Sequence, residues 1–129
     1  MRRLTNETVL AVGRLTLAST ELEYLLACIG ADQAGGDPAG LFTSPSPGEP
    51  LRAARGSVQF APPQRRAEFV GLVETAGSYL LQGQSAVRAM WFDGSQVDAT
   101  TFDEISGLLL RCRDRLQALL DDADRAPAG

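Results

Sequence analysis

Arg88 and Trp91 are two side chains of this 129-residue chain whose types and spacing suit them to bind a ligand. They lie three residues apart in the stretch GQSAVRAMWF, residues 83–92, and would be neighbours on one face of a helix. The guanidinium group can then stack on the indole ring or pair with a carboxylate. Gly83 and Gln84 open the same stretch, and a glycine on a packed helix face admits a neighbouring helix. We expect close packing at Gly83, with a ligand pocket as the alternative.

A carboxylate near the start of the chain is a candidate partner for Arg88 or for Arg14. Glu21 and Glu23 are two residues apart and must point to different faces of a helix, and Glu23 lies beside Leu22 and Leu26. It is therefore the better candidate for a buried carboxylate, and the alternative is that both acids are solvated. The candidate ligand-binding residues are Arg88, Trp91, Tyr24, Glu23, Gln84 and Gly83, and no residue is assigned a catalytic role.

Two residue types are missing from the chain. It has no histidine, and all 12 basic residues are arginine. Without histidine there is no ordinary general base near neutral pH and no imidazole metal ligand. Without lysine, Schiff-base chemistry and a P-loop are excluded. The net charge of -4 argues against nucleic-acid binding, and the exclusive use of arginine is typical of a GC-rich bacterial genome.

A metal site could be built from four further carboxylates if they met in a helical bundle. They are Glu68, Glu74, Asp103 and Glu104. A di-iron bundle needs a Glu-x-x-His pair, which a chain without histidine cannot supply. Nothing in the spacing of these acids marks a magnesium or calcium site. We expect no metal and no cofactor.

The cysteines and the N-terminus indicate where the protein resides. Cys28 and Cys112 are far apart and outside any CxxC motif, so we interpret them as small buried apolar residues in a reducing compartment. Asn6, Glu7 and Arg14 interrupt the apolar run that a signal peptide would need. No run approaches the length of a membrane span. We expect a cytoplasmic protein with no membrane partner.

The first helix is expected over 6–30, with Thr5 or Asn6 as its cap and Gly30 as its end. Its buried face has the spacing of an amphipathic helix. That face comprises Val12, Leu15, Ser19, Leu22, Leu26 and Ile29. We expect the face to be broadened by Leu10, Leu17, Tyr24 and Cys28.

Residues 31–50 are rich in proline and glycine, which predicts a flexible loop with one short turn around 39–42. A short helix is expected over 51–59. The loop is long for a structureless connection, so it is either a mobile surface segment or a lid.

A third helix should begin at Pro62-Pro63 and end at the turn Asp93-Gly94. Its regular apolar face is the strongest periodic signal in the chain. That face comprises Phe69, Val73, Ala76, Leu80, Gly83, Val87 and Met90.

A fourth helix should begin at Thr101, which has capping-box spacing to Glu104. Its expected core face is Ile105, Leu109, Cys112, Leu116 and Leu119. The tail, 121–129, should be frayed. The sequence thus predicts one all-α domain over 1–129, an antiparallel bundle of three long helices plus a short helix.

This helix pattern resembles the HEPN superfamily of small helical bundles. The resemblance rests on the ELEYLL segment of the first helix, the variable linker, and a polar cluster before Trp91 in the third long helix. That helix often carries an Arg-Asn-x-x-x-His signature in the superfamily. Here Gly83 stands at the arginine position and Arg88 at the histidine position.

The resemblance implies a bundle that is often dimeric and that acts either as a ribonuclease or as a non-catalytic, partner-binding domain. Cleavage of RNA through the 2′-hydroxyl needs a group that exchanges a proton near neutral pH, and arginine, with a pKa above about 12, does not. We therefore expect a non-catalytic interaction module, a homodimer that binds a protein partner. The alternative is a small-molecule-binding protein, or a histidine-free biosynthetic enzyme, with a pocket near Gly83 and Arg88.

Overall fold

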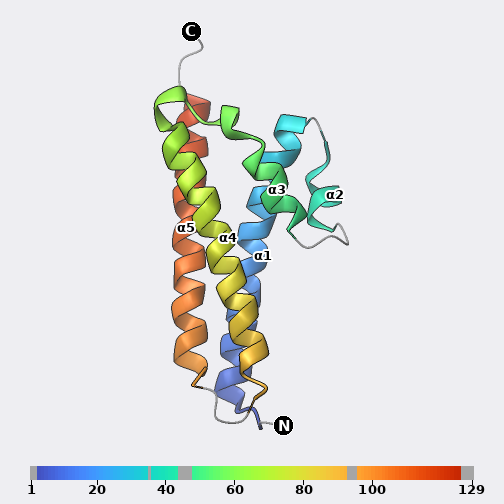
Figure 1. Ribbon diagram of the computed structural model, residues 1–129, viewed down its shortest axis with the longest axis vertical. Helices are drawn as coiled ribbons and strands as arrows, with labels where there is room; N and C mark the ends of the chain where they lie inside the picture. Colours follow the sequence, from blue (N-terminus) through green and yellow to red (C-terminus); the bar gives the residue numbers. More distant parts are fainter. Residues whose placement is uncertain (1–2, 35, 44–47, 93–95, 126–129) are drawn as a thin grey trace.

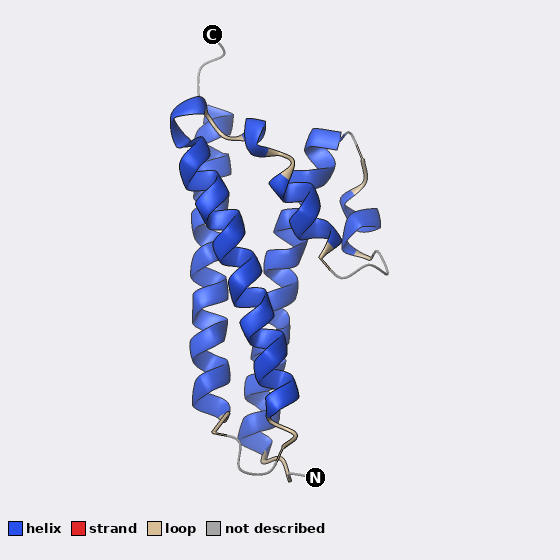
Figure 2. Cartoon of the chain, viewed as in Figure 1, coloured by secondary structure: helices blue, strands red, loops and turns tan. Residues whose placement is uncertain are grey.

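The computed structural model describes residues 3–34, 36–43, 48–92 and 96–125, and within these ranges it contains helices and no strand (Figure 2). The all-α class expected from the sequence is confirmed. Three helices are long: α1 (Asn6–Ala34), α4 (Arg66–Ala89) and α5 (Ala99–Arg125). None of the described helices combines the length and apolarity needed to cross a membrane.

Consecutive long helices run in opposite directions along the bundle axis (Figure 1). α1 rises from the lower end of the view, α4 descends, and α5 rises again, so α1 and α5 point the same way. α5 packs along both of the others, whereas α1 and α4 make few direct contacts. A groove lies between α1 and α4 and is lined by side chains of both helices.

Short helices connect α1 to α4 and pack beside the upper half of α1 (Figure 1). They are α2 (Pro38–Phe42), α3 (Glu49–Arg55) and the 3-10 turns η1 (Val58–Phe60) and η2 (Pro63–Arg65). α2 is the turn expected around 39–42, and α3 begins two residues before the expected short helix. The segment 31–50, expected to be a loop, is thus helical at both ends, while residues 35 and 44–47 lie outside the described ranges.

The core follows the apolar periodicity of α4 and α5. All the residues predicted for these two faces are buried except Val87, which is half-buried. On α1 the predicted broadening of the face is wrong for Leu10, Leu17 and Tyr24, which are exposed. The face widens on its other side, where Ala11 and Ala18 are buried against the core. The small side chains of Ala11 and Ala18 therefore belong to the core, and the large side chains of the predicted broadening lie outside it.

Thr5, one of the two expected caps, is confirmed, whereas several other helix ends differ from expectation. α4 begins at Arg66, after the 3-10 turn η2, and not at Pro62-Pro63. The Thr5 hydroxyl accepts a hydrogen bond from the Thr8 amide at 3.1 Å, so Thr5 is the cap of α1. α1 continues through Gly30 to Ala34, and α5 begins before Thr101 because Asp98 is its cap. The expected turn at 93–94 lies outside the described residues. α5 also remains helical to Arg125, through part of the segment expected to be frayed.

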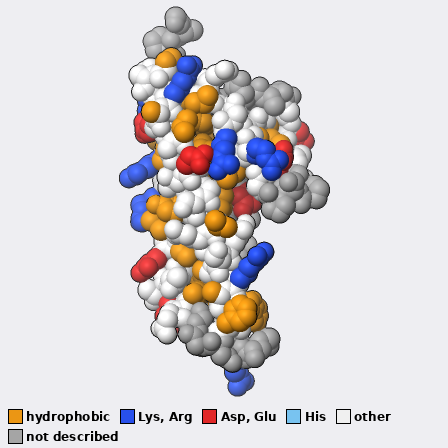
Figure 3. Space-filling view, viewed as in Figure 1, with side chains coloured by type: hydrophobic (Ala, Val, Ile, Leu, Met, Phe, Trp, Pro, Cys, Tyr) orange, Lys and Arg blue, Asp and Glu red, His pale blue; other side chains and the backbone are white. Residues whose placement is uncertain are grey.

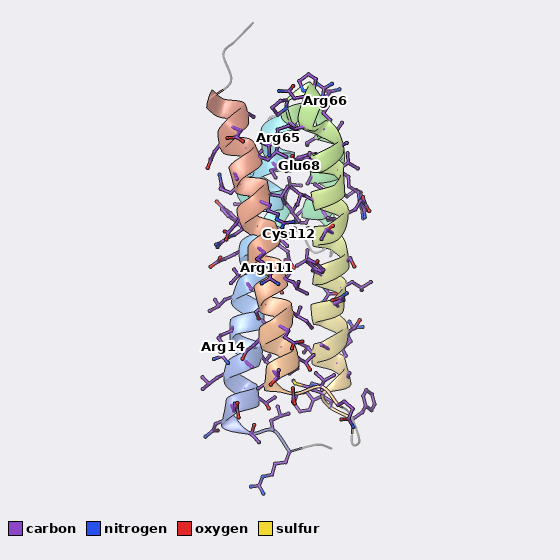
Figure 4. The ribbon with its side chains drawn as sticks, turned by 90° about the vertical axis from the view of Figure 1, so that its left-hand side faces the viewer. Arg14, Arg65, Arg66, Glu68, Arg111 and Cys112 are labelled. Atoms are coloured by element: carbon purple, nitrogen blue, oxygen red, sulfur yellow. The ribbon has the colours of Figure 1, made fainter. Side chains whose placement is uncertain are left out.

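Ion pairs join the long helices along their exposed edges. Arg14 of α1 binds Asp103 of α5 through two hydrogen bonds, of 2.9 and 3.1 Å. Arg65 binds Glu68 and also Asp122, which ties the start of α4 to the end of α5 (Figure 4). Pairs exposed in this way contribute little to stability, at most about 1 kcal/mol each, but they fix the register of the bundle.

Candidate functional site

α3 is seated between α1 and α4 on two glycines. A Cβ added at Gly30 of α1 would lie 2.3 Å from the Cβ of Ala53, so α3 rests directly on the α1 backbone. On α4, a Cβ at Gly77 would lie 2.8 Å from Cδ2 of Leu51. These close approaches place α3 across the groove between the long helices.

A bidentate ion pair holds the same helix from its other end. Nε and Nη2 of Arg55 donate hydrogen bonds of 2.8 and 3.2 Å to the carboxylate of Glu74 on α4. Figure 3 shows acidic and basic side chains side by side in the region where α3 crosses α4. α3 is thus fixed to both long helices, and it forms one wall of the space between them.

Two hollows lie along the α1–α4 groove. The larger, which we call the α3 cavity, has a volume of about 550 Å³ and is bounded by α1, α3 and α4. The smaller, which we call the lower groove, has a volume of about 300 Å³ and runs from Glu23 past Gly83 to Arg88. Glu23 and Gln84 line both hollows, so the two meet at these side chains.

The structure brings together four of the six candidate residues. Glu23, Gly83, Gln84 and Arg88 all line the lower groove. Gly83 itself is packed: a Cβ there would lie 3.4 Å from Leu15 and 3.8 Å from Ile105. The glycine therefore forms part of the floor of a shallow groove and does not open a deep hollow in the core.

Tyr24 and Trp91 lie apart from this groove. The Tyr24 ring packs edge-on against Phe42 of α2, with ring centroids 5.5 Å apart and an angle of 89° between the planes. Trp91 is exposed just beyond the end of α4. Among the described residues Arg88 neither stacks on Trp91 nor pairs with a carboxylate, so the expected Arg88 contacts are absent there.

Glu23 is the half-buried carboxylate that the sequence predicts. Burial raises its pKa above the ordinary value. Within the described part of the chain no arginine or hydrogen-bond donor is paired with it, so neither Arg88 nor Arg14 is its partner. An ionised side chain in this position lacks full hydration, and among the described residues no opposite charge is paired with it.

The sequence reasoning missed the contribution of α3. Arg55, Leu51 and Pro50 line the α3 cavity together with Glu74 and Ser78 of α4. Glu74 was considered only as a metal ligand, and in the described ranges no three Cys, Asp or Glu side chains gather in a way that would hold a metal ion. The available signal was Gly77, because a glycine inside an otherwise regular helix often marks a close approach by another element.

The groove therefore offers an apolar surface with a few polar groups, and among the described residues neither Glu23 nor Arg88, which both line it, is paired with an opposite charge. Comparisons of the chain with protein-family models, with curated proteins and with solved structures give no significant match. Any statement about function accordingly rests on the side chains and surfaces described above.

Proposed function

We propose that the chain is a non-catalytic, HEPN-like interaction module that works as a homodimer, with the outer face of α1 as the contact between the two copies. The observation that carries this is an exposed apolar stripe formed by Leu10, Leu17 and Tyr24. Seven-residue spacing places these side chains on one line along the helix. Gly13 and Thr20 lie between them, and a Cβ at Gly13 would meet no atom within 4 Å. We call these five residues the α1 stripe.

The α1 stripe has the composition of an interface core. It contains no charged residue, although Asp, Glu, Lys and Arg make up 22% of the chain. Exposed apolar side chains that lie next to one another on a small domain are typical of a contact surface. The small residues at Gly13 and Thr20 would allow a second helix to approach closely, which increases the apolar contact along the stripe.

Charges beside the stripe favour a second copy of this chain in antiparallel orientation. Arg14 and Glu21 flank it on the same side, seven residues apart, and each forms an ion pair within the chain, Arg14 with Asp103 and Glu21 with Arg113. A contact between copies would extend these two pairs across the interface. In an antiparallel pair related by a two-fold axis at Leu17, equivalent flanks face each other, so Arg14 of each copy meets Glu21 of the other. The same register sets Leu10 against Tyr24. A parallel pair would bring opposite flanks together and would lose this complementarity.

We propose a non-catalytic module because of the residues at positions 83–88, where the HEPN superfamily often carries its Arg-Asn-x-x-x-His signature. Arg88 replaces the residue that would exchange a proton, and the chain has no histidine anywhere. The resemblance also implies a protein partner in addition to the second copy. The end of α4 supports this part of the proposal, because Trp91 and Phe92 are exposed there and apolar side chains cluster at that end of the face in Figure 3.

The test is the mass of the protein in solution, measured by sedimentation equilibrium over a range of micromolar concentrations. We expect a dimer for the wild type and a monomer for Leu17→Glu, which places two carboxylates face to face at the two-fold axis. Leu81→Glu on α4 is the matched control, since Leu81 is 64% exposed and Leu17 is 66% exposed. It should leave the dimer intact.

A charge reversal tests the register. Arg14→Glu should weaken the dimer by repulsion from Glu21 of the other copy. Because it also removes the Arg14–Asp103 ion pair, the control is Asp103→Asn, which removes the same pair, leaves Arg14 and Glu21 unchanged and should leave the dimer intact. A wild-type protein that stays monomeric, or equal dissociation by Leu17→Glu and Leu81→Glu, would rule out the α1 stripe as the dimer contact.

A further inference from the structure

The α3 cavity is large enough for a small organic molecule. Its volume of about 550 Å³ lies within the range of roughly 300–1,000 Å³ that is usual for ligand sites. Apolar side chains from all three bounding helices line it, among them Leu26, Leu51, Leu80 and Leu81. A ligand that occupied the cavity would therefore bury an apolar body against α1, α3 and α4.

The charged groups that face this cavity come from each bounding helix. α1 supplies Glu23, α3 supplies Arg55 and α4 supplies Glu74. Arg55 and Glu74 neutralise each other through their two hydrogen bonds. Glu23 has no partner among the described residues, so the described part of the lining carries one net negative charge. Arg88 of α4 lies in the adjoining lower groove, which Glu23 also lines. Ser78 and Gln84 add uncharged polar groups at the α4 wall.

From this juxtaposition we propose that the α3 cavity binds a small organic cation, an ammonium group attached to an apolar body, with Glu23 as its counter-ion. The ammonium group would donate charge-assisted hydrogen bonds to the Glu23 carboxylate, and the apolar body would lie against the leucines. An anion of the same size would face the Glu23 carboxylate, since Arg55, the arginine among the described lining residues, is already bound to Glu74.

Binding of this kind is linked to the ionisation of Glu23. The cation interacts with the carboxylate form, so its affinity should decrease as pH falls and Glu23 takes up a proton. Because burial sets the pKa of Glu23 above the ordinary value, the decrease should begin at a higher pH than for an exposed glutamate. Glu74 faces the same cavity and is bound to Arg55 by two hydrogen bonds.

The proposal does not depend on the homodimer, because the cavity lies between α1, α3 and α4 and the α1 stripe lies on the outer face of α1. The test uses three probes that share one apolar chain: hexylammonium, hexanol and hexanoate. Each is titrated into the ¹⁵N-labelled protein at pH 7, and amide shifts are followed by NMR. We expect saturable shifts in the residues of the cavity with hexylammonium, and roughly tenfold weaker binding of hexanol, which lacks the charge-assisted bond.

Two variants and a matched control complete the test. Glu23→Gln keeps the shape of the side chain and should weaken hexylammonium binding about tenfold, to the level of hexanol. Ser78→Phe should block the cavity from its exposed wall and abolish binding of both probes. Glu104→Gln removes an exposed acid on α5 and should change nothing. The proposal is overturned if hexylammonium gives no saturable shifts, if hexanol or hexanoate binds as tightly, or if Glu23→Gln and Glu104→Gln behave alike.

Discussion

Gly30 of α1 and Ala53 of α3 are in direct backbone contact. A Cβ at Gly30 would lie 2.3 Å from the Ala53 Cβ and 3.0 Å from its carbonyl carbon. Neither of these atoms belongs to a flexible side-chain end, so no rotamer change could relieve the overlap. The glycine that the sequence suggested as a helix end is therefore the point where α3 docks, and it determines where the wall of the α3 cavity stands.

Gly30→Ala should destabilise the protein by roughly 1–3 kcal/mol, because overpacking of this size displaces a neighbouring element. Gly83→Ala should instead stabilise the protein, since its new methyl group would meet Leu15 at an ordinary contact distance of 3.4 Å. It should raise the free energy of unfolding by up to about 1 kcal/mol through helix propensity. Urea unfolding measures both, with Gly71→Ala, which meets no atom within 4 Å, as the propensity control. Equal effects of Gly30→Ala and Gly83→Ala would contradict the close docking of α3.

Much of the long-helix core could be predicted from the sequence because its side chains obey the helical period. Phe69, Val73 and Leu80 of α4 lie on one line and are buried, as expected. When a helix carries apolar residues on two adjacent faces, the helical period alone does not show which of the two faces the core. On α1, Leu17 and Ala18 are adjacent, and the structure buries Ala18 and exposes Leu17.

The candidate site was predictable only in part, for a different physical reason. Gly83, Glu23 and Arg88 come together because long helices carry residues of fixed spacing into one groove. Arg55 and Leu51 could not be placed, since the position of α3 depends on close contacts with Gly30 and Gly77 and not on any periodicity. Trp91 was misplaced because the helix ends at Ala89, two residues before it.

The cap of α5 gives a second test. Oδ1 of Asp98 accepts a hydrogen bond of 3.2 Å from the Thr101 amide, which satisfies one of the free amides in the first turn. Asp98→Ala should therefore lower the free energy of unfolding by about 1 kcal/mol, and Asp98→Asn should be nearly neutral. Glu104→Ala should have little effect, because the Thr101–Glu104 capping box expected from the sequence does not form. A larger loss for Glu104→Ala than for Asp98→Ala would show that the cap is assigned wrongly.

The two cysteines should differ in reactivity. Cys112 is buried, its thiol lies 3.5 Å from the Leu72 carbonyl oxygen, and burial raises its pKa to about 11 (Figure 4). At pH 8 only about one Cys112 thiol in a thousand would be ionised, and the thiolate is the reactive form. Cys28 is half-buried on α1.

Titration of the native protein with a chromogenic disulfide reagent at pH 8 should thus show one fast thiol. Cys28→Ser should remove the fast phase and Cys112→Ser should retain it, while both thiols react quickly in denaturant. The slow rate in Cys28→Ser should rise about tenfold per pH unit until pH approaches the raised pKa. Equal rates for the two single variants in the native state would refute the assignment.

Glu23 should make the stability of the protein depend on pH in a defined direction. Burial raises its folded-state pKa above the ordinary value of 4.5, so the folded protein holds this proton at pH values where the unfolded chain has lost it. The free energy of unfolding then falls as pH rises through the interval between the two pKa values, and it stays lower above that interval. Glu23→Gln, which carries no charge, should therefore be more stable than the wild type at pH 7, and this advantage should disappear below the ordinary pKa.

Urea unfolding of both proteins at pH 7 and near pH 4 measures the difference, and Glu104→Gln provides the baseline for an exposed acid. Hexylammonium at saturating concentration should stabilise the wild type at pH 7 and not Glu23→Gln, because a ligand that binds the folded state adds its binding free energy to stability. A binding residue should lower the free energy of unfolding when the cavity is empty and raise it when a cation is bound. A residue with a purely structural role would not show this reversal. If Glu23→Gln is instead less stable than the wild type at pH 7, Glu23 has a structural partner and the α3 cavity loses its charged anchor.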